Sequence, residues 1–295
     1  MEIKTITIKN DEIKVDISTL GAEVVNVEKN GAKRIWEGKV EIWSGHSPIL
    51  FPICSKLKDG TYEYNGKKYQ MPSHGFTRRS VFEVVSEEKS SATFLLSSNE
   101  EIKKQYPFDF ELRVHFKLDK NKLCVYYIVE NKGSEVMYFN VGCHEAYAID
   151  SELKNYSILF EGEDKIENTL FSERLLETDK SEILLKDNKL QLKMDYFNGE
   201  FMHNGVLCYN DSIIIENVKN KSVTLLKGEE PIIDVYFADF NHLVIWTGGE
   251  GFIAIEPWNG LPDTYNCSGK LKDKKAIDKV EPSSSKTFYH SIVFN

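Results

Sequence analysis

Short stretches in which apolar and polar residues alternate recur along the whole chain, and residues 13–18 and 122–130 are clear examples. A period of two is typical of a β-strand with one buried face. Turn signals such as Asn30-Gly31 and Asn65-Gly66 separate these stretches, as in antiparallel sheets with tight turns. Further strand candidates lie at 24–27, 61–64, 67–71, 81–86, 92–96, 108–118, 137–141, 157–160, 212–216, 222–226 and 232–237. The chain is therefore predicted to be all-β, a large antiparallel β-sandwich with few short helices.

No linker, repeat or low-complexity tract interrupts the 295 residues, so we expect a single β-sandwich domain over 1–295. One short helix is predicted over 99–105, with Ser98 as its N-cap and Pro107 as its stop. The polar segment 165–195 is expected to cover one edge of a sheet with irregular strands and loops.

The net charge of −9 disfavours a nucleic-acid backbone or an anionic membrane as the partner, and weakly favours a small neutral ligand. The five cysteines have neither CxxC nor metal-ligand spacing, which indicates no disulfide framework and no metal site. The amino end has no signal-peptide pattern, and no stretch approaches the roughly 18 apolar residues of a membrane span. We therefore expect a cytoplasmic monomer or homodimer.

Three stretches, 72–78, 140–147 and 252–263, place an ionisable residue beside Gly or Pro where a strand ends. They contain His74, His144 and Glu256, two imidazoles and a carboxylate that could form a general acid/base set. The predicted hairpin over 61–71 is expected to present His74. Gly75 lets the backbone there approach another segment closely.

Each of these residues also has an ordinary structural explanation. A histidine in a β protein is more often a hydrogen-bonded polar residue than a catalyst, and this reading is applied to the remaining histidines, His46, His115, His203, His242 and His290. Glu256 follows the apolar run 252–255, so it is expected to be partly desolvated and a stronger base, or else to form a buried ion pair.

The motifs HGFTR at 74–78, GCHEAY at 142–147 and IEPWNGLPD at 255–263, with GAEVV near the amino end, resemble the aldose 1-epimerase (galactose mutarotase) family in its LacX-like branch. The resemblance implies a sandwich with a sugar site, and interconversion of the α and β anomers of a free hexose such as galactose or glucose. It implies that Glu256 is the base on the C1 hydroxyl, that His144 is the acid at the ring oxygen, and that His74 hydrogen-bonds the sugar. It implies no cofactor and no metal.

The same resemblance suggests the substrate-binding residues. Trp258 and Phe76 are candidates for apolar contact with the sugar ring, although both could belong to the core. Arg78 is expected to bind hydroxyls or to hold a carboxylate, and Asp211 is a weaker candidate for a hydroxyl acceptor. Lys56 stands where many relatives have arginine, so it would donate as a point charge without the planar fork.

Three other functions remain open. A hexose-6-phosphate 1-epimerase would need several cations, which Lys56, Arg78 and Arg79 could supply, although an alternating strand would turn the two arginines to opposite sides. A carbohydrate-binding protein without turnover would keep the pocket alone. Glycoside hydrolysis would need a second carboxylate, and Glu145 is expected to point away from His144.

Overall fold

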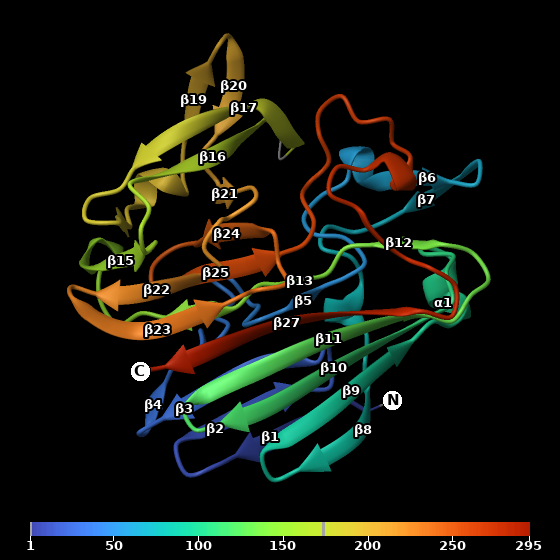
Figure 1. The fold of residues 1–295 in the computed structure, drawn as a ribbon, viewed down its shortest axis with the longest axis horizontal. Helices are drawn as coiled ribbons and strands as arrows, with labels where there is room; N and C mark the ends of the chain where they lie inside the picture. The colour runs from blue at the N-terminus through green and yellow to red at the C-terminus, as the bar shows by residue number, and fades with distance from the viewer. Residues whose placement is uncertain (1, 173–174) are drawn as a thin grey trace.

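A computed structural model of the protein describes residues 2–172 and 175–295 and is built almost entirely of antiparallel strands (Figure 1). The larger of its two main sheets has nine strands in the order β18-β15-β22-β23-β27-β11-β10-β9-β8. Its strands are β8 (Glu83–Glu88), β9 (Ser91–Ser97), β10 (Phe110–Asp119), β11 (Lys122–Asn131), β15 (Tyr156–Leu159), β18 (Lys189–Gln191), β22 (Ser222–Lys227), β23 (Glu230–Tyr236) and β27 (Ser285–Phe294). The predicted all-β antiparallel fold is confirmed.

The smaller main sheet carries two of the three motifs, those at 142–147 and 255–263. Its order is β21-β24-β25-β13-β5, with β14 also paired to β25. Its strands are β5 (Ile49–Leu50), β13 (Gly142–Cys143), β14 (Ala146–Ala148), β21 (Ile213–Ile215), β24 (His242–Trp246) and β25 (Phe252–Trp258). Ile253 and Ile255 of β25 belong to the same buried cluster as Val125 and Tyr127 of β11, so the two main sheets share one core.

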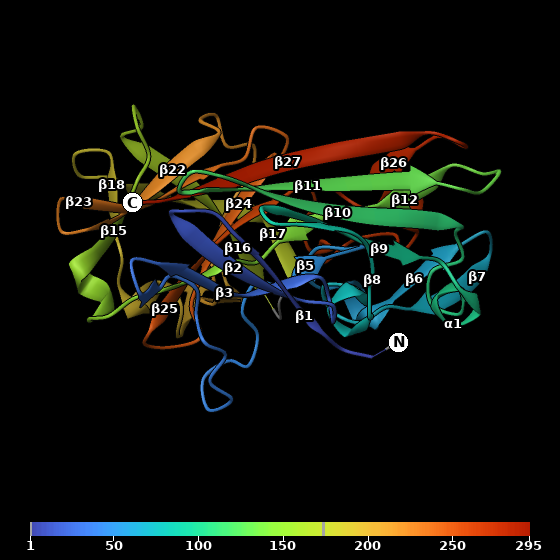
Figure 2. The same ribbon diagram turned by 90° about the horizontal axis from the view of Figure 1, so that it is seen from below.

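A four-stranded sheet formed by the amino-terminal residues completes this core. It consists of β1 (Thr5–Lys9), β2 (Ile13–Ser18), β3 (Glu23–Lys29) and β4 (Ala32–Lys33). In β2 the buried residues alternate with partly exposed ones, as the sequence predicts, and its buried side chains join the main cluster. Figure 2 shows β2 and β3 as a layer below β10, β11 and β27.

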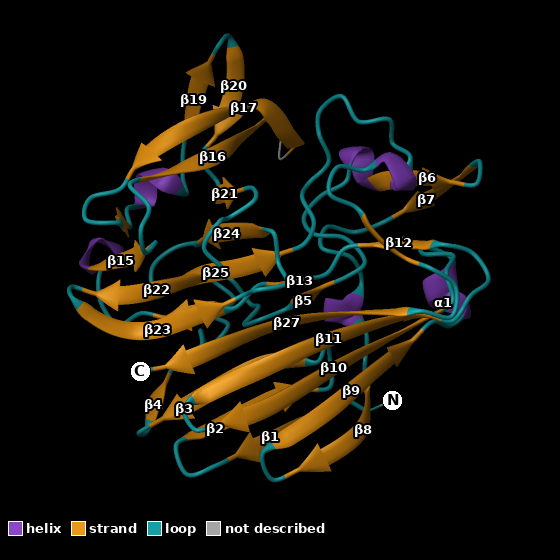
Figure 3. Cartoon of the chain, in the orientation of Figure 1, coloured by secondary structure: helices purple, strands orange, loops and turns teal. Residues whose placement is uncertain are grey.

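Helices are short and lie between strands (Figure 3). They are α1 (Glu100–Lys103) and the 3₁₀ turns η1 (Lys58–Gly60), η2 (Thr77–Arg79), η3 (Leu153–Asn155), η4 (Met194–Tyr196) and η5 (Leu271–Asp273). The predicted cap of α1 was wrong by one residue, because the Asn99 side chain, and not that of Ser98, accepts the N–H groups of Glu101 and Ile102. Within the described ranges no helix is long and apolar enough to cross a membrane.

Four two-stranded sheets surround the main sheets. They are β6 (Thr61–Tyr64) with β7 (Lys67–Gln70), β12 (Met137–Phe139) with β26 (Asp278–Val280), β16 (Lys165–Ser172) with β17 (Leu175–Leu184), and β19 (Glu200–His203) with β20 (Val206–Tyr209). The expected hairpin closed by Asn65-Gly66 is confirmed as β6–β7.

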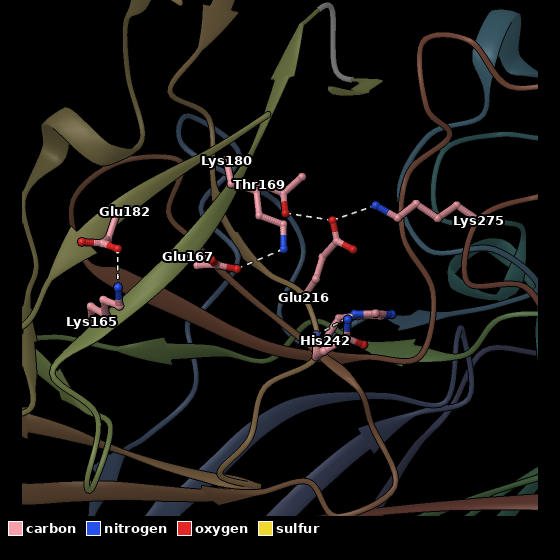
Figure 4. A network of polar contacts seen from close by, with 9 residues as sticks. Lys165, Glu167, Thr169, Lys180, Glu182, Glu216, His242 and Lys275 are labelled. Atoms are coloured by element: carbon pink, nitrogen blue, oxygen red, sulfur yellow. Dashed lines mark hydrogen bonds and ion pairs between the residues drawn. The ribbon is translucent and has the colours of Figure 1, made fainter. Parts of the chain in front are cut away.

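The segment 165–184 is more regular than the sequence suggests. It forms the long hairpin β16–β17, with one bulge between Thr169 and Phe171, although residues 173 and 174 lie outside the described residues. The hairpin covers the β21 edge of the six-stranded sheet, as expected. There the Glu216 carboxylate accepts hydrogen bonds from the Thr169 hydroxyl at 2.9 Å and from Lys275 Nζ at 2.8 Å (Figure 4).

One close backbone approach ties the segment after β7 to the segment after β5. Gly75, with φ of 75°, forms a parallel bridge with Phe51, and the Phe76 N–H donates to the Phe51 carbonyl at 3.1 Å. A Cβ atom on Gly75 would lie 1.9 Å from that carbonyl oxygen, so glycine is required here. The expected close approach at Gly75 is therefore present, and its partner is the Phe51 peptide.

We predict that Gly75→Ala lowers the free energy of unfolding by about 3 kcal/mol or more, because the added methyl group must displace the Phe51 backbone. Gly66→Ala is the matched control, since Gly66 also has positive φ but has no atom within 4 Å of the added Cβ. It should cost about 1 kcal/mol. Urea unfolding followed by tryptophan fluorescence measures both, and equal losses would contradict the role given to Gly75.

Candidate active site

A cavity of about 200 Å³ opens on the face of the six-stranded sheet that is turned away from the shared core. It lies where β24, β25, β13 and β5 run side by side. Its lining residues are Trp43, Pro48, Leu50, Ser55, His74, Arg78, His144, Asp211, Ser212, Val244, Trp246, Glu256 and Trp258. The three candidate catalytic residues therefore come together from three distant parts of the chain, as predicted.

The alternation of β25 places Glu256 on the cavity side of the sheet. Ile253 and Ile255 enter the shared core, whereas Glu256 and Trp258 line the cavity. Glu256 pairs across the strands with Val244 of β24, which lines the cavity too. Only 1% of Glu256 is exposed, so this carboxylate is almost completely removed from water.

Glu256 and His144 form the centre of the site. His144 Nε2 lies 3.4 Å from Glu256 Oε1, and Glu256 Oε2 is buried without a hydrogen-bond partner among the described residues. Burial raises the pKa of Glu256 well above its ordinary value, and the nearby Glu145 and Asp211 carboxylates raise it further. Burial lowers the pKa of His144 to about 4. Burial thus disfavours both the Glu256 carboxylate and the His144 imidazolium. The proton affinities of the two groups are brought closer together, so the pair is suited to exchange a proton.

Two tryptophans that the sequence reasoning missed enclose His144. Trp43 stacks on its imidazole, with ring centroids 4.9 Å apart and an interplanar angle of 22°, and Trp246 meets it edge-on at 5.3 Å. Trp43 lies in the polar segment between β4 and β5, and Trp246 precedes Thr247-Gly248-Gly249. The sequence did contain a signal for both residues, because a tryptophan in a loop or at the end of a strand often marks a binding surface.

His74 is held in one tautomer by the segment after β5. The Ser55 N–H donates to His74 Nδ1 at 3.1 Å, so the neutral ring carries its proton on Nε2. The His74 N–H in turn donates to the Ser55 carbonyl at 2.8 Å, and both residues have positive φ. Burial and the neighbouring His144 and Arg78 keep the pKa of His74 well below its ordinary value. The segment after β5, and not the β6–β7 hairpin as expected, positions this histidine.

The two consecutive arginines separate as predicted, although they lie in a 3₁₀ turn rather than in an alternating strand. Arg78 is partly buried and lines the cavity, whereas Arg79 is exposed. Glu23, from the GAEVV motif, accepts the N–H groups of His46 and Ser47 at 2.7 and 2.9 Å. Glu23 therefore fixes the segment that leads to Pro48 in the cavity wall.

The predicted binding residues divide into three groups. Trp258 and Asp211 line the cavity, and the Trp258 indole N–H donates to the Cys143 carbonyl at 3.2 Å. Phe76 is 4% exposed and packs edge-on against Phe51, which places it in the core rather than on the cavity wall. Lys56 lines a second cavity, which shares Asp211 with the first.

A buried polar cluster lies on the opposite side of the motif around His144. Glu145 Oε1 lies 2.9 Å from His290 Nε2, and the ligand atoms of Cys143, Glu145 and His290 lie within 4.8 Å of one another. Cys143 Sγ donates to the Pro257 carbonyl at 3.4 Å. Glu145 thus points away from His144, as expected. The absence of a metal stays a prediction.

Comparisons with known proteins bear on the family and the fold of this chain. The family model described as aldose 1-epimerase matches residues 4–275. The plasmid-encoded protein LacX of Lactococcus lactis subsp. lactis is 30% identical over 99% of this chain and 100% of its own length. The crystal structure of a galactose mutarotase related enzyme from Lactobacillus acidophilus has a TM-score of 0.91 at 30% identity, covering 99% of this chain and 97% of that one. A galactose mutarotase-like protein from Lactobacillus casei has a TM-score of 0.90 at 26% identity, covering 99% and 100%.

We predict that Trp43→Ala raises the pKa of His144 from about 4 toward the ordinary value of a histidine, because removal of the stacked indole admits water to the imidazole. Trp43→Phe keeps a stacked ring and should leave the pKa low. Titration of the histidine ring signals by NMR measures both variants. An unchanged pKa in Trp43→Ala would contradict the role of Trp43 in desolvating His144.

Proposed function

Because the chain belongs to the aldose 1-epimerase family, we propose that it interconverts the α and β anomers of a free hexose such as glucose or galactose. The observation that carries the proposal is the buried Glu256 carboxylate 3.4 Å from the His144 imidazole at the wall of a cavity. Neither a redox change nor group transfer is needed for this reaction.

The chemistry requires an acid and a base side by side. To open the ring, the C1 hydroxyl loses a proton while the ring oxygen gains one, and the bond between C1 and the ring oxygen breaks. Both oxygens are bonded to C1, so the groups that serve them must be neighbours. In the reactive form the one proton of the pair has passed from Glu256 to His144, so the ionised Glu256 takes the hydroxyl proton while the protonated His144 gives its proton to the ring oxygen. C1 then rotates, and the reverse transfers close the ring on its other face.

The remaining polar residues orient the sugar. His74 stays neutral and donates from Nε2, because its Nδ1 already accepts the Ser55 N–H. Arg78 donates to hydroxyl oxygens, and Asp211 accepts from hydroxyl groups. Trp43, Trp246 and Trp258 provide apolar faces for the C–H surface of the pyranose.

A free hexose fits the charges better than a hexose phosphate. Arg79 is exposed outside the cavity, so Arg78 is the arginine of this turn that lines it. Lys56 lines the adjoining cavity together with the carboxylates of Glu200 and Asp211. A phosphate usually requires several convergent cations, and two carboxylates beside one lysine oppose it.

We predict that the wild-type protein accelerates mutarotation of freshly dissolved α-D-glucose or α-D-galactose, measured by polarimetry. Glu256→Gln and His144→Ala should each lower kcat by about 10²- to 10⁴-fold, since each removes one positioned proton carrier. Glu111→Gln and His115→Ala are the matched controls, because both residues lie on β10 in the nine-stranded sheet. They should keep the wild-type rate.

Two results would count against this assignment. If the wild-type protein does not exceed the buffer rate with either hexose but accelerates glucose 6-phosphate, the substrate is a sugar phosphate. If it binds hexoses in calorimetry and accelerates none of these sugars, it is a binding protein that has kept the residues of the family without turnover.

The pH dependence of kcat/KM should be bell-shaped, because ring opening needs one proton on the Glu256–His144 pair. Acid adds a second proton to the pair near the pKa of about 4 of His144, and alkali removes the first proton at the raised pKa of Glu256. Polarimetry across the pH range, with the buffer rate subtracted at each pH, gives the profile. An acid limb at the ordinary histidine value would contradict the desolvation of His144.

A further inference from the structure

A second polar pair, formed by Glu145 and His290, lies on the core side of the six-stranded sheet, behind the candidate active site. Glu145 follows His144 directly, between β13 and β14, and its side chain points to the opposite side of the sheet. His290 is on β27 of the nine-stranded sheet, and its Nε2 lies 2.9 Å from Glu145 Oε1. Both residues are buried. Their hydrogen bond therefore joins the two main sheets inside the shared core.

The pair is costly for the core, so packing alone does not explain it. Tyr127 stacks on the His290 ring, with centroids 5.7 Å apart and an interplanar angle of 11°, and Phe240 meets that ring edge-on at 6.1 Å. Glu145 Oε2 and His290 Nδ1 have no hydrogen-bond partner among the described residues. Apolar side chains can often replace a buried polar pair of this kind without loss of stability. The cost therefore points to a function of the pair outside core packing.

The pair holds one negative charge. A charged His290 ring would bury its Nδ1–H donor without an acceptor, so the favoured form is the neutral ring, which donates from Nε2 to the Glu145 carboxylate. The other titratable groups that face Glu145 from the core side are Cys143 of β13, Tyr127 of β11 and Tyr147 of β14. Burial raises the pKa of all three well above their ordinary values, so they are neutral near pH 7. These groups therefore leave the Glu145 charge in place.

The pair is connected to the two proton carriers through the backbone and through space. The Ile255 N–H donates to the Glu145 carbonyl at 3.2 Å, so the neighbours of Glu256 and His144 are bonded to each other. A shift of Glu145 would therefore change the 3.4 Å separation of His144 Nε2 and Glu256 Oε1. Burial is the largest cause of the shifted pKa values of Glu256 and His144, and the Glu145 carboxylate moves both values upward. Other charged groups that act on these two residues are Glu23, Arg78 and Asp211.

We propose that Glu145 and His290 are positioning residues for the anomer interconversion. Their hydrogen bond holds the segment of His144 against β25 from the core side, and the Glu145 carboxylate places a negative charge behind both proton carriers. The inference rests on the proposed function, because it concerns the two residues to which that function assigns the proton transfers. Neither Glu145 nor His290 lines the cavity, so the affinity for the sugar should not depend on them.

The first test replaces the pair without leaving an unpaired polar group. The double variant Glu145→Leu/His290→Phe keeps the core filled with apolar side chains, so urea unfolding should show no loss of stability. We expect kcat for glucose or galactose to fall about tenfold at an unchanged KM, because His144 is held less precisely. Glu145→Gln keeps an acceptor for His290 Nε2–H and should restore most of the rate. Ile292→Val, a buried apolar change on the same strand, is the matched control and should alter neither constant.

The second test isolates the charge with Glu145→Gln. Without the negative charge, Glu256 and His144 both bind their protons less tightly. The acid limb and the alkaline limb of the kcat/KM profile should therefore both move to lower pH, by about one unit. NMR titration of the His144 ring should show the same direction of shift in this variant.

The outcomes separate this inference from the proposed function. If the double variant keeps the wild-type kcat, or if both limbs stay in place in Glu145→Gln, the inference is overturned although mutarotation stands. If the double variant does not fold, the pH profile of Glu145→Gln decides the inference. If the wild-type protein turns over no sugar, the proposed function fails, and the NMR titration decides whether the pair acts on His144. A lower pKa of His144 in Glu145→Gln supports that action, and an unchanged pKa overturns it.

Discussion

The arrangement of this protein depends on a carboxylate, that of Glu256, which is buried at the wall of a cavity on the six-stranded sheet. Burying an unpaired charge costs several kcal/mol, and Glu256 has only the His144 imidazole, 3.4 Å away, as its ion-pair partner among the described residues. The backbone must resist the relaxation that would bring water to the carboxylate. It can do so because β25 lies between β24 and β13, and the residues of both β24 and β25 are almost entirely buried. The raised pKa of Glu256 is the chemical consequence.

Two close backbone approaches bring the histidines to this carboxylate. Gly142 in β13 pairs with both Trp258 and Leu50, and a Cβ atom there would lie 2.8 Å from Trp258 Cδ1 and 2.9 Å from Cys54 Sγ. Because Gly142 has no side chain, β13 can pack closely against β25 and β5, and His144, two residues later, lies beside Glu256. Gly75 does the same for His74 through the Phe51 peptide. As a result the two imidazole centroids lie 5.7 Å apart. The candidate active site thus depends on two glycines that carry no chemistry of their own.

The proposed reaction site and the adjoining cavity at Lys56 are formed by different parts of the fold. Glu256 on β25 and His144 between β13 and β14 carry the proposed proton transfers, and neighbouring strands of the six-stranded sheet hold both segments. The adjoining cavity is instead formed by the base of the peripheral β19–β20 hairpin and the segment at Lys56, so its lining can vary without disturbing the sheet. The pairing of Glu216 with Thr169 and Lys275 and the bridge between Leu176 and Thr264 fasten the β16–β17 hairpin to the sheet.

The sequence alone predicted many of the strands and the β6–β7 turn, because a period of two and a tight turn are local properties of the chain. Only the tertiary structure decided the surroundings of the site. Nothing local to Trp43 reports that it stacks on His144, and nothing local to Ser55 reports that it fixes the tautomer of His74. For the same reason the sequence left open whether Phe76 lies in the core, where the structure places it, and did not indicate that Lys56 lines the adjoining cavity. Which side chains meet depends on the register and direction of segments far apart in sequence, and long-range packing sets these.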